Sequence, residues 1–304
     1  MKLSFSTRGW PSLSFEEMLD VASDMGFSGV EVYNLSKFDP LMEKGGPFHK
    51  YNTAATVRRL RERGLSIPCF DTSLDISSDK GAVSTVINLI EIADSARVPY
   101  VVVCALTDNE DAVFSALGEI LPVAEKKGVS VLIKTSGIYS DTARLRSALD
   151  RFASDNLAAL WDVHHPYRDN GETGDMTIKN LGSYVCHVHM RDSDDEGKYQ
   201  LIGEGTMPID DVIRALSSVN YDAFISLEWK PEWLEDLQDP EVIFPHFVNY
   251  MSHFHSTRCL CRLWQSTTTP SRVMSRRTGI MQAAARPTRI PNTTIMPRLE
   301  RITP

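Results

Sequence analysis

The sequence lacks any hydrophobic run long enough to cross a membrane, since no stretch reaches about 18 uninterrupted apolar residues. The N-terminal segment also has no apolar stretch of signal-peptide length, because Arg8 and Pro11 interrupt it first. These absences argue against a transmembrane or secreted protein and against a membrane partner. We therefore expect a cytoplasmic protein.

Cysteine is scarce, and its number is odd. The five cysteines are Cys69, Cys104, Cys186, Cys259 and Cys261. The first three lie inside apolar runs, and the last two form a C-x-C pair rather than a zinc-binding C-x-x-C. This pattern excludes a disulfide scaffold, and we interpret the first three as reduced core thiols.

An excess of positive charge is also missing. The 40 Asp and Glu residues outnumber the 32 Lys and Arg residues, which gives a net charge of -8. Because a nucleic-acid binder neutralises phosphates with basic side chains, we expect no nucleic-acid partner. The 304 residues are 42% hydrophobic, which is enough for a large buried core and excludes a collagen, a coiled coil or wholesale disorder.

The C-terminal end has a different composition from the rest of the chain. Residues 258–304 contain nine Arg, one Glu and no Lys or Asp, a formal charge of +8, whereas residues 1–257 carry -16. This end is rich in Thr and Pro and has no sustained apolar period. We therefore predict a folded domain over residues 1–254 and a disordered Arg/Thr/Pro-rich tail over residues 255–304. A basic arm for an acidic partner and out-of-frame translation are the two other interpretations.

Residues 1–254 alternate short β-branched runs with amphipathic stretches, which is typical of β/α units. The helix predicted over residues 14–25 opens with Ser14 and Glu17 at capping-box spacing. Gly26, Gly64 and Gly128 each stand where a left-handed residue ends a helix before the next strand. The acidic run 192–196 is predicted to be a solvated loop. The predicted strands are 3–7, 29–33, 65–71, 100–105, 129–134, 158–162, 185–189 and 224–229.

Eight strand and helix units in about 250 residues match a closed (β/α)8 barrel. An open doubly wound sheet is the alternative, but no G-x-G-x-x-G follows the first strand and no Walker A sequence occurs. We predict an α/β protein, a (β/α)8 TIM barrel followed by a disordered basic tail.

Ionisable residues close most of the predicted strands. In a TIM barrel the carboxyl ends of the strands surround the active site. Burying charges there is costly unless they are paired or bound to a metal, so their convergence indicates a functional site. We expect Glu31 to line the substrate pocket. The strand-end residues are Arg8, Glu31, Asp71, Lys134, Asp162, His189 and Glu228.

Asp162, His189 and Glu228 come from consecutive strands, so their side chains can meet on one side of the barrel. Two carboxylates and one imidazole suit a divalent ion such as Mn, Mg, Co or Zn and leave positions open for substrate oxygens. We therefore predict a divalent metal cofactor held by these three residues.

A family resemblance rests on three motifs: Trp161-Asp162-Val-His-His165, His187-Val-His189-Met-Arg191-Asp192 and Ile225-Ser-Leu-Glu228-Trp229. Residues 1 to 254 resemble the xylose isomerase-like sugar phosphate isomerase/epimerase superfamily. That group includes ketose 3-epimerases, inosose and 3-dehydroshikimate dehydratases and endonuclease IV nucleases, so the resemblance implies a TIM barrel more firmly than a substrate.

The resemblance implies roles for single residues. Asp162, His189 and Glu228 would hold the metal, and Glu228 would also move protons. His165, in the family's Asp-x-x-His spacing, would contact substrate oxygens. Arg191 would anchor a substrate hydroxyl, carboxylate or phosphate.

One position departs from the family pattern. The family holds its metal with a further Glu after strand five, and this sequence has Lys134 there. A unit positive charge about 4 Å from a dication is opposed by roughly 8 kcal/mol at an effective dielectric of about 20. We therefore expect that a metal ion and a protonated Lys134 do not share the site.

Three arrangements of Lys134 stay open. It is protonated and replaces the metal, balanced by Asp162 and Glu228; it is neutral beside a three-ligand metal and acts as general base; or it turns away and pairs with an acid such as Asp141. A Schiff base between Lys134 and a ketose is a further hypothesis.

The predicted function is a sugar, sugar phosphate or cyclitol isomerase or epimerase, assisted by the divalent metal. It transfers a proton beside a carbonyl through an enediolate, with Glu228 and Lys134 as catalytic residues on opposite faces. A dehydratase of keto sugars or keto acids that uses Lys134, and a non-catalytic sugar-binding barrel, are the alternatives. The expected partners are a small carbohydrate or keto-acid substrate and a second copy of the chain.

Overall fold

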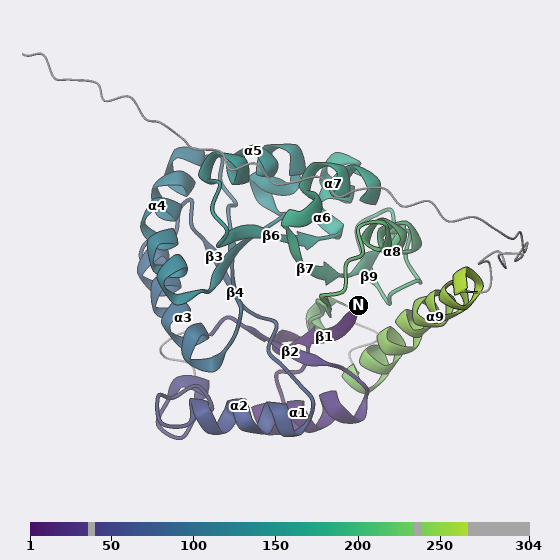
Figure 1. Ribbon diagram of the computed structural model, residues 1–304, viewed down its shortest axis with the longest axis horizontal. Coiled ribbons are helices and arrows are strands. Elements are labelled where there is room, and N and C mark those ends of the chain that lie inside the picture. The colour runs from purple at the N-terminus through teal and green to yellow at the C-terminus, as the bar shows by residue number, and fades with distance from the viewer. Residues whose placement is uncertain (36–39, 234–238, 267–304) are drawn as a thin grey trace, which may run out of the picture. The chain divides into compact units, whose positions relative to one another are not determined.

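The computed structural model describes residues 1–35, 40–233 and 239–266, with side chains up to residue 254. Eight parallel strands form a ring in which the first pairs with the last, so the sheet closes (Figure 1). This confirms the (β/α)8 TIM barrel. The strands of the ring are β1 (Lys2–Ser6), β2 (Gly29–Tyr33), β3 (Cys69–Asp75), β4 (Tyr100–Cys104), β5 (Ser130–Lys134), β6 (Leu157–Asp162), β7 (Val185–Met190) and β10 (Phe224–Leu227).

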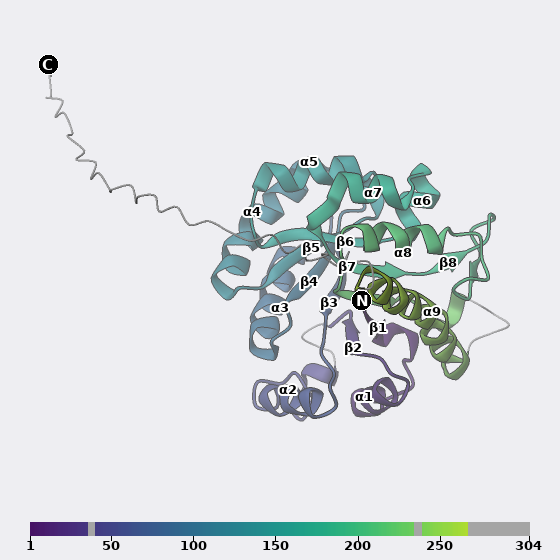
Figure 2. The same ribbon diagram turned by 45° about the vertical axis from the view of Figure 1, so that its right-hand side comes forward.

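Helices surround the ring of strands (Figures 1 and 2). Neighbouring helices also contact one another: Arg59 pairs with Glu16, and Arg63, which directly follows the helix of Arg59, pairs with Asp20. The helices are α1 (Phe15–Asp24), α2 (Thr53–Glu62), α3 (Ala82–Ala96), α4 (Glu110–Lys127), α5 (Thr142–Phe152), α6 (His164–Asn170), α7 (Gly174–Leu181), α8 (Ile209–Ser218) and α9 (Pro240–Ser266). Short 3-10 turns include η1 (Thr7–Gly9), η2 (Pro40–Met42), η3 (Gly137–Ser140), η4 (Gly182–Tyr184) and η5 (Pro231–Trp233).

The interior of the barrel is apolar on the side of β3 to β6. Side chains of a strand alternate between its two faces, so residues two apart point the same way. Lys134 follows Leu132 by two residues at the end of β5, and Asp162 ends β6 in the same relation to Leu160. The apolar interior therefore supports both polar side chains from below. Its cluster consists of Cys69, Val102, Leu132, Ala158 and Leu160.

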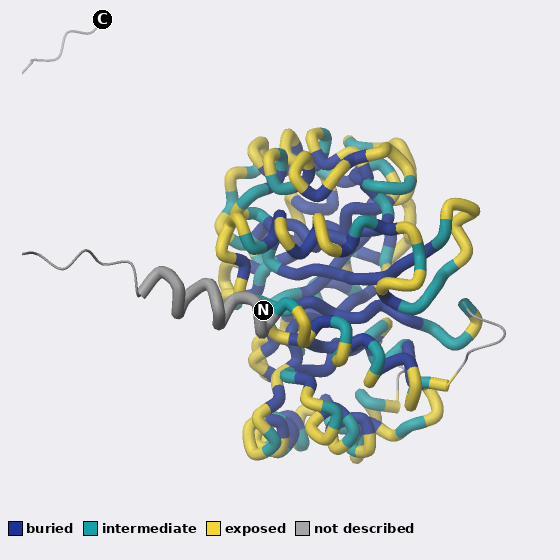
Figure 3. Tube along the Cα trace, turned by 90° about the vertical axis from the view of Figure 1, so that its right-hand side faces the viewer, coloured by how far each residue is buried: buried dark blue, intermediate teal, exposed yellow. Residues whose placement is uncertain are grey.

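The larger core lies between the barrel and its helices, where Figure 3 shows buried strands enclosed by helices with exposed outer faces. In α9, Phe244 is fully buried, and its ring stacks on Phe5 of β1 with centroids 4.6 Å apart. Trp10 and Phe27 contact the same ring, with centroids at 5.3 and 6.2 Å. Phe244 thus packs the last helix onto the first strand.

The predicted helix boundaries around α1 are confirmed. Ser14 Oγ accepts a hydrogen bond from the N–H of Glu17 at 3.3 Å, and the Glu17 carboxylate accepts one from the N–H of Ser14 at 2.8 Å. Gly26, Gly64 and Gly128 have φ angles of 83°, 68° and 65°. These left-handed conformations explain why glycine ends each helix.

We expect Ser14→Ala to lower the free energy of unfolding by about 1 kcal/mol, because the N–H of Glu17 loses its acceptor. Ser14→Asp is the matched control, since a carboxylate can still cap the helix, and it should stay close to the natural protein. Urea denaturation measures both variants. An equal loss in both would contradict the capping role of Ser14.

The strand β3 begins and ends later than predicted, at Cys69–Asp75 instead of 65–71. Pro68 has no N–H to donate to a neighbouring strand, and Ser66 forms only an isolated bridge with Gly29. A register shift against β4 then carries the strand on from Asp71 to Asp75. Asp71 consequently lies within the strand.

Two further features differ from a simple repeat of β/α units. A short hairpin, β8 (Asp192–Ser193) with β9 (Tyr199–Gln200), follows β7 and was not predicted. Two helices, α6 and α7, follow β6. No helix among the described residues is long and apolar enough to cross a membrane. Cys69, Cys104 and Cys186 are free thiols, as predicted.

The chain divides into two compact units, Met1–Leu260 and Cys261–Pro304. The helix α9 runs to Ser266, past the predicted domain boundary at residue 254. Residues 267–304 lie outside the described residues, so the disordered tail and its other interpretations stay predictions.

Candidate functional site

Four of the predicted site residues meet at the carboxyl ends of adjacent strands. Lys134, Asp162, His189 and Glu228 come from β5, β6, β7 and the residue after β10, which are neighbours in the ring. Their exposed fractions are 7%, 0%, 0% and 3%. The strand register places Asp162 beside His189. The carboxyl end of the barrel thus buries a cluster of ionisable groups.

Lys134 lies between two carboxylates. Its Nζ donates a hydrogen bond to Glu228 Oε1 at 2.8 Å and is 3.3 Å from Asp162 Oδ2. Burial lowers the pKa of Lys134, but Glu228 and Asp162 raise it by more, so the net shift is upward. Lys134 is therefore an ammonium ion. Asp141, its other expected partner, instead accepts backbone hydrogen bonds at the start of α5.

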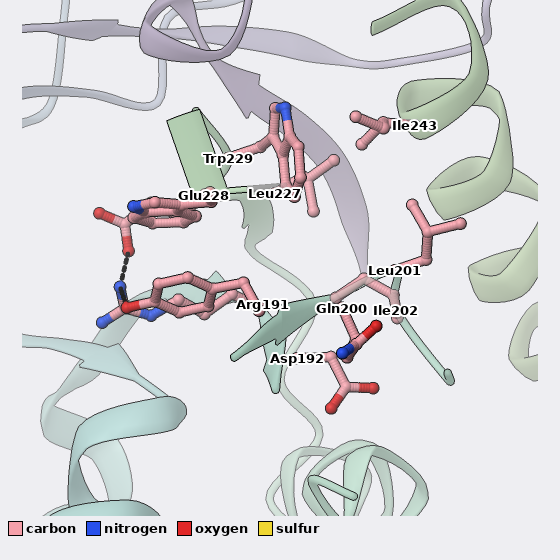
Figure 4. Close-up of a pocket in the computed structure, with 11 residues that line it drawn as sticks. Arg191, Asp192, Gln200, Leu201, Ile202, Leu227, Glu228, Trp229 and Ile243 are labelled. Carbon is pink, nitrogen blue, oxygen red and sulfur yellow. Dashed lines mark hydrogen bonds and ion pairs between the residues drawn. The ribbon is translucent and has the colours of Figure 1, made fainter. Parts of the chain in front are cut away.

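Two arginines complete the ionic cluster. Arg191 Nη2 donates to Asp162 Oδ2 at 2.7 Å, and Arg191 Nη1 is 3.5 Å from Glu228 Oε2 (Figure 4). Arg8 Nη1 lies 3.7 Å from Glu228 Oε1. Burial raises the pKa of Glu228, but Lys134 and Arg191 hold it well below its usual range. Glu228 is thus a carboxylate surrounded by three cations.

A second polar layer lies deeper in the barrel. Glu31 Oε2 accepts hydrogen bonds from His187 Nε2 at 2.9 Å and from His189 Nε2 at 2.8 Å. Burial lowers the pKa of His189, but the Glu31 and Glu228 carboxylates together outweigh it and raise that pKa to about 10. Glu31 is fully buried. If Glu31 takes part in substrate binding as predicted, it would therefore act through His189 and not by direct contact.

Among the residues that the structure describes, two sets of side chains have ligand atoms within 4.8 Å of one another and could hold a metal ion. They are Glu31, His187 and His189, and Asp71, His189 and Glu228. The predicted set of Asp162, His189 and Glu228 is not one of them. Lys134 Nζ stands between Asp162 and Glu228. As they lie, the predicted ligands do not fit a divalent ion, because an ammonium group already uses their oxygens.

Aromatic rings flank the ionic cluster. Tyr199 stacks on Trp233 with centroids 4.1 Å apart, and the Tyr199 hydroxyl accepts a hydrogen bond from Arg191 Nη1 at 3.2 Å. The guanidinium groups of Arg191 and Arg8 lie 5.3 and 5.6 Å from the Trp233 ring. Both rings line a cavity of about 10 Å³ together with Glu228 and Arg191, and Figure 4 shows the last two. It has room for about one water molecule.

Two adjacent histidines at the start of α6 take different positions. His165 is partly exposed, and its Nδ1 lies 3.0 Å from Asp169 Oδ2. His164 is buried, with its Nε2 3.1 Å from Ser193 Oγ. Burial, followed by the charge of Arg191, lowers the pKa of His164 to about 4. The contact of His165 with a substrate stays a prediction.

Asp192 corrects one part of the prediction that residues 192–196 form a solvated loop, whereas Asp195 and Glu196 are exposed as predicted. The Asp192 side chain is 1% exposed. Asp192 Oδ2 accepts hydrogen bonds from the N–H groups of Gly203 and Gly205 at 2.9 and 3.1 Å, and Oδ1 accepts one from Met207 at 3.1 Å. A Cβ on Gly205 would lie only 2.2 Å from Asp192 Oδ1. Asp192 therefore fixes the turn that follows the hairpin, directly after Arg191.

Sequence reasoning gave no role to His187, Tyr199 or Trp233. His187 is two residues before His189 in β7, and this spacing was a usable signal that both point into the barrel. Tyr199 and Trp233 belong to the connections after β7 and β10. No periodic pattern places such connections relative to one another.

A closed barrel with buried ionisable side chains at the carboxyl ends of its strands defines a TIM-barrel protein whose site lies where such barrels carry their chemistry. Residues 19–244 match the xylose isomerase-like TIM barrel family. The chain belongs to this family, which confirms the resemblance seen in the sequence.

Individual relatives are distant. The chain is 25% identical over 194 residues to an uncharacterized protein of Methanocaldococcus jannaschii, covering 60% of this chain and 62% of that protein, less than two thirds of its length. It is 23% identical over 258 residues to fructoselysine 3-epimerase of Escherichia coli O157:H7, covering 75% and 90%.

Among solved structures, the IOLI protein with a bound zinc atom superposes with a TM-score of 0.66. It is 15% identical to this chain and the match covers 82% of this chain and 96% of that one. At this identity the likeness shows the fold alone.

Proposed function

We propose that this chain is an isomerase or epimerase that moves a proton beside the carbonyl group of a sugar, sugar phosphate or cyclitol-derived ketone. The observation that carries the proposal is the buried contact between the Glu228 carboxylate and the Lys134 ammonium, at 2.8 Å. A proton acceptor and a fixed positive charge are what an enediolate reaction requires. The epimerase among the relatives supports the same chemistry.

Glu228 is the group proposed to accept the proton from carbon. Lys134 and Arg191 keep it ionised before the reaction. A substrate oxygen that takes over a hydrogen bond from Lys134 loosens the ion pair with Glu228. The Glu228 carboxylate then becomes a stronger base once the substrate is bound.

Lys134 and Arg191 are proposed to stabilise the oxygen on which negative charge develops. Both are buried cations with N–H groups directed at the same two carboxylates. In a water-excluded site such donors favour an enediolate oxygen strongly. Because Lys134 is held protonated, a Schiff base would first require loss of both ion pairs.

The contact between Lys134 and Glu228 bears on the stereochemistry. In this arrangement the two groups act from one side, which suits return of the proton to the neighbouring carbon and hence isomerisation. Epimerisation needs a proton from the opposite face. Lys134 would have to leave Glu228 and reach that face after the substrate binds.

Solvent exchange tests the proposal. The full chain is incubated in D2O with ketohexoses and with fructoselysine, and NMR follows the C–H beside the carbonyl. We expect deuterium to enter at that carbon, and Glu228→Gln to lower the exchange rate roughly 10²- to 10⁴-fold. Binding without exchange would favour a non-catalytic sugar-binding barrel, and loss of water from the sugar would favour the dehydratase.

A further inference from the structure

We infer that the Lys134 ammonium takes the place of a divalent metal ion, so that this site holds a fixed organic cation between Asp162 and Glu228. The inference goes beyond the proposed function, because it concerns what the site binds in the absence of any substrate. It rests on the position of Lys134 Nζ, on the use of the neighbouring oxygens and on the charge of the cluster.

The position of the ammonium is set by the barrel. Lys134 is the last residue of β5, and its neighbour β6 ends at Asp162. Nζ lies 2.8 Å from Glu228 Oε1 and 3.3 Å from Asp162 Oδ2. A metal ion bound by both carboxylates would have to occupy the same space. With only 7% of Lys134 exposed, the side chain has little room to retreat into solvent.

The carboxylate oxygens of the site are already used by other cations. Asp162 Oδ2 also accepts a hydrogen bond from Arg191 Nη2 at 2.7 Å. Glu228 Oε2 faces Arg191 Nη1 at 3.5 Å, and Glu228 Oε1 faces Arg8 Nη1 at 3.7 Å. A divalent ion would have to break these pairs and then lie next to the displaced charges.

The charges of the cluster support the same conclusion. Its carboxylates are Glu31, Asp71, Asp162 and Glu228, and its permanent cations are Lys134, Arg191 and Arg8. With His189, which the neighbouring carboxylates hold protonated, four positive charges balance the four negative ones. A dication would turn this into an excess of positive charge in a buried site, which opposes its binding.

The two other sets of possible ligands share residues with the ionic cluster and are only partly engaged in hydrogen bonds. In the set of Glu31, His187 and His189, both imidazoles point Nε2 at the same carboxylate oxygen and donate to it. In the set of Asp71, His189 and Glu228, the Glu228 oxygen nearest to His189 is the one that faces Arg191. His189 Nδ1 and Glu228 Oε2 have no hydrogen-bond partner among the described residues, so the second set is the one that an ion would use if Lys134 did not exclude it.

The test is a titration of the full chain with Mn²⁺, without substrate. Isothermal calorimetry compares the natural protein with Lys134→Glu, which replaces the ammonium by a carboxylate, and elemental analysis measures metal retained after purification without chelator. We expect no stoichiometric metal in the natural protein and an affinity of Lys134→Glu for Mn²⁺ that is higher by roughly 100-fold or more. Lys80→Glu is the control for an added carboxylate, because Lys80 is exposed in the connection between β3 and α3. Its affinity for Mn²⁺ should match that of the natural protein.

Two outcomes would overturn the inference. One is a natural protein that retains one equivalent of metal, or that binds Mn²⁺ as tightly as Lys134→Glu. Loss of that binding in Asp71→Asn would then assign the ion to Asp71, His189 and Glu228. The other is a folded Lys134→Glu variant with no gain in affinity.

A further variant keeps the test decisive if Lys134→Glu does not fold. Lys134→Gln removes only the positive charge, and circular dichroism reports its folding. We expect its affinity for Mn²⁺ to exceed that of the natural protein by roughly 10-fold, and equal affinities would contradict the inference. The Mn²⁺ titration contains no substrate, so a result that overturns this inference does not decide the solvent-exchange test. A failed solvent-exchange test likewise does not decide the titration.

Discussion

Replacing Lys134 with methionine is expected to lower the rate of solvent exchange into the substrate roughly 10²- to 10³-fold, the effect of losing one strong donor to a developing oxyanion. The same variant should lose about 3–5 kcal/mol of unfolding free energy, because Glu228 and Asp162 stay buried without their shared ammonium. Methionine fills a similar volume, so the change removes charge rather than packing. NMR in D2O and urea denaturation measure the two effects.

Lys80→Met is the matched control for this variant, since Lys80 is exposed and outside the site. It should leave both the exchange rate and the stability near those of the natural protein. A Lys134→Met protein with full activity would refute the catalytic role of Lys134. Full stability would show that Arg191 and Arg8 suffice to balance the two carboxylates.

Phe244→Ala should destabilise the barrel by about 3–5 kcal/mol, as is usual for deleting a buried aromatic ring. Phe244 is fully buried, and the change removes its stacking on Phe5 and its contacts with Trp10 and Phe27. Tight packing is also evident at Gly9, where a Cβ would lie 2.9 Å from the Phe244 ring. The urea midpoint measures the loss.

Val242→Ala is the control for this core variant. Val242 is in the same helix, but 46% of its surface is exposed. Its replacement should change the unfolding free energy by no more than about 0.5 kcal/mol. If Val242→Ala and Phe244→Ala were equally destabilised, the loss would reflect helix α9 itself and not the ring that it buries.

The barrel and the convergence of its strand ends could be predicted because both follow from periodicity. A parallel strand buried on both faces leaves a short apolar run, and a charged residue that closes such a run is easy to recognise. Lys134, Asp162 and His189 stand out on that basis, and the ring order of β5, β6 and β7 brings them together. Ser14 and the helix-ending glycines were predictable from local hydrogen-bond chemistry.

Other parts of the site depend on contacts that no local pattern encodes. Asp192 was expected in solvent because acids crowd around it, yet the N–H groups of a turn more than ten residues later hold it in the interior. The stack of Tyr199 on Trp233 joins two separate connections. The pairing of Lys134 was left open among several partners, since the choice depends on which oxygens the fold brings within reach.

The central claim, that Lys134 stands where a metal would otherwise bind, is tested most directly by anomalous diffraction from crystals of the full chain grown with Mn²⁺. The account predicts density for Lys134 Nζ between Asp162 and Glu228, and no manganese peak among Asp162, His189 and Glu228. A strong anomalous peak at that position, with Lys134 turned away from both carboxylates, would contradict it.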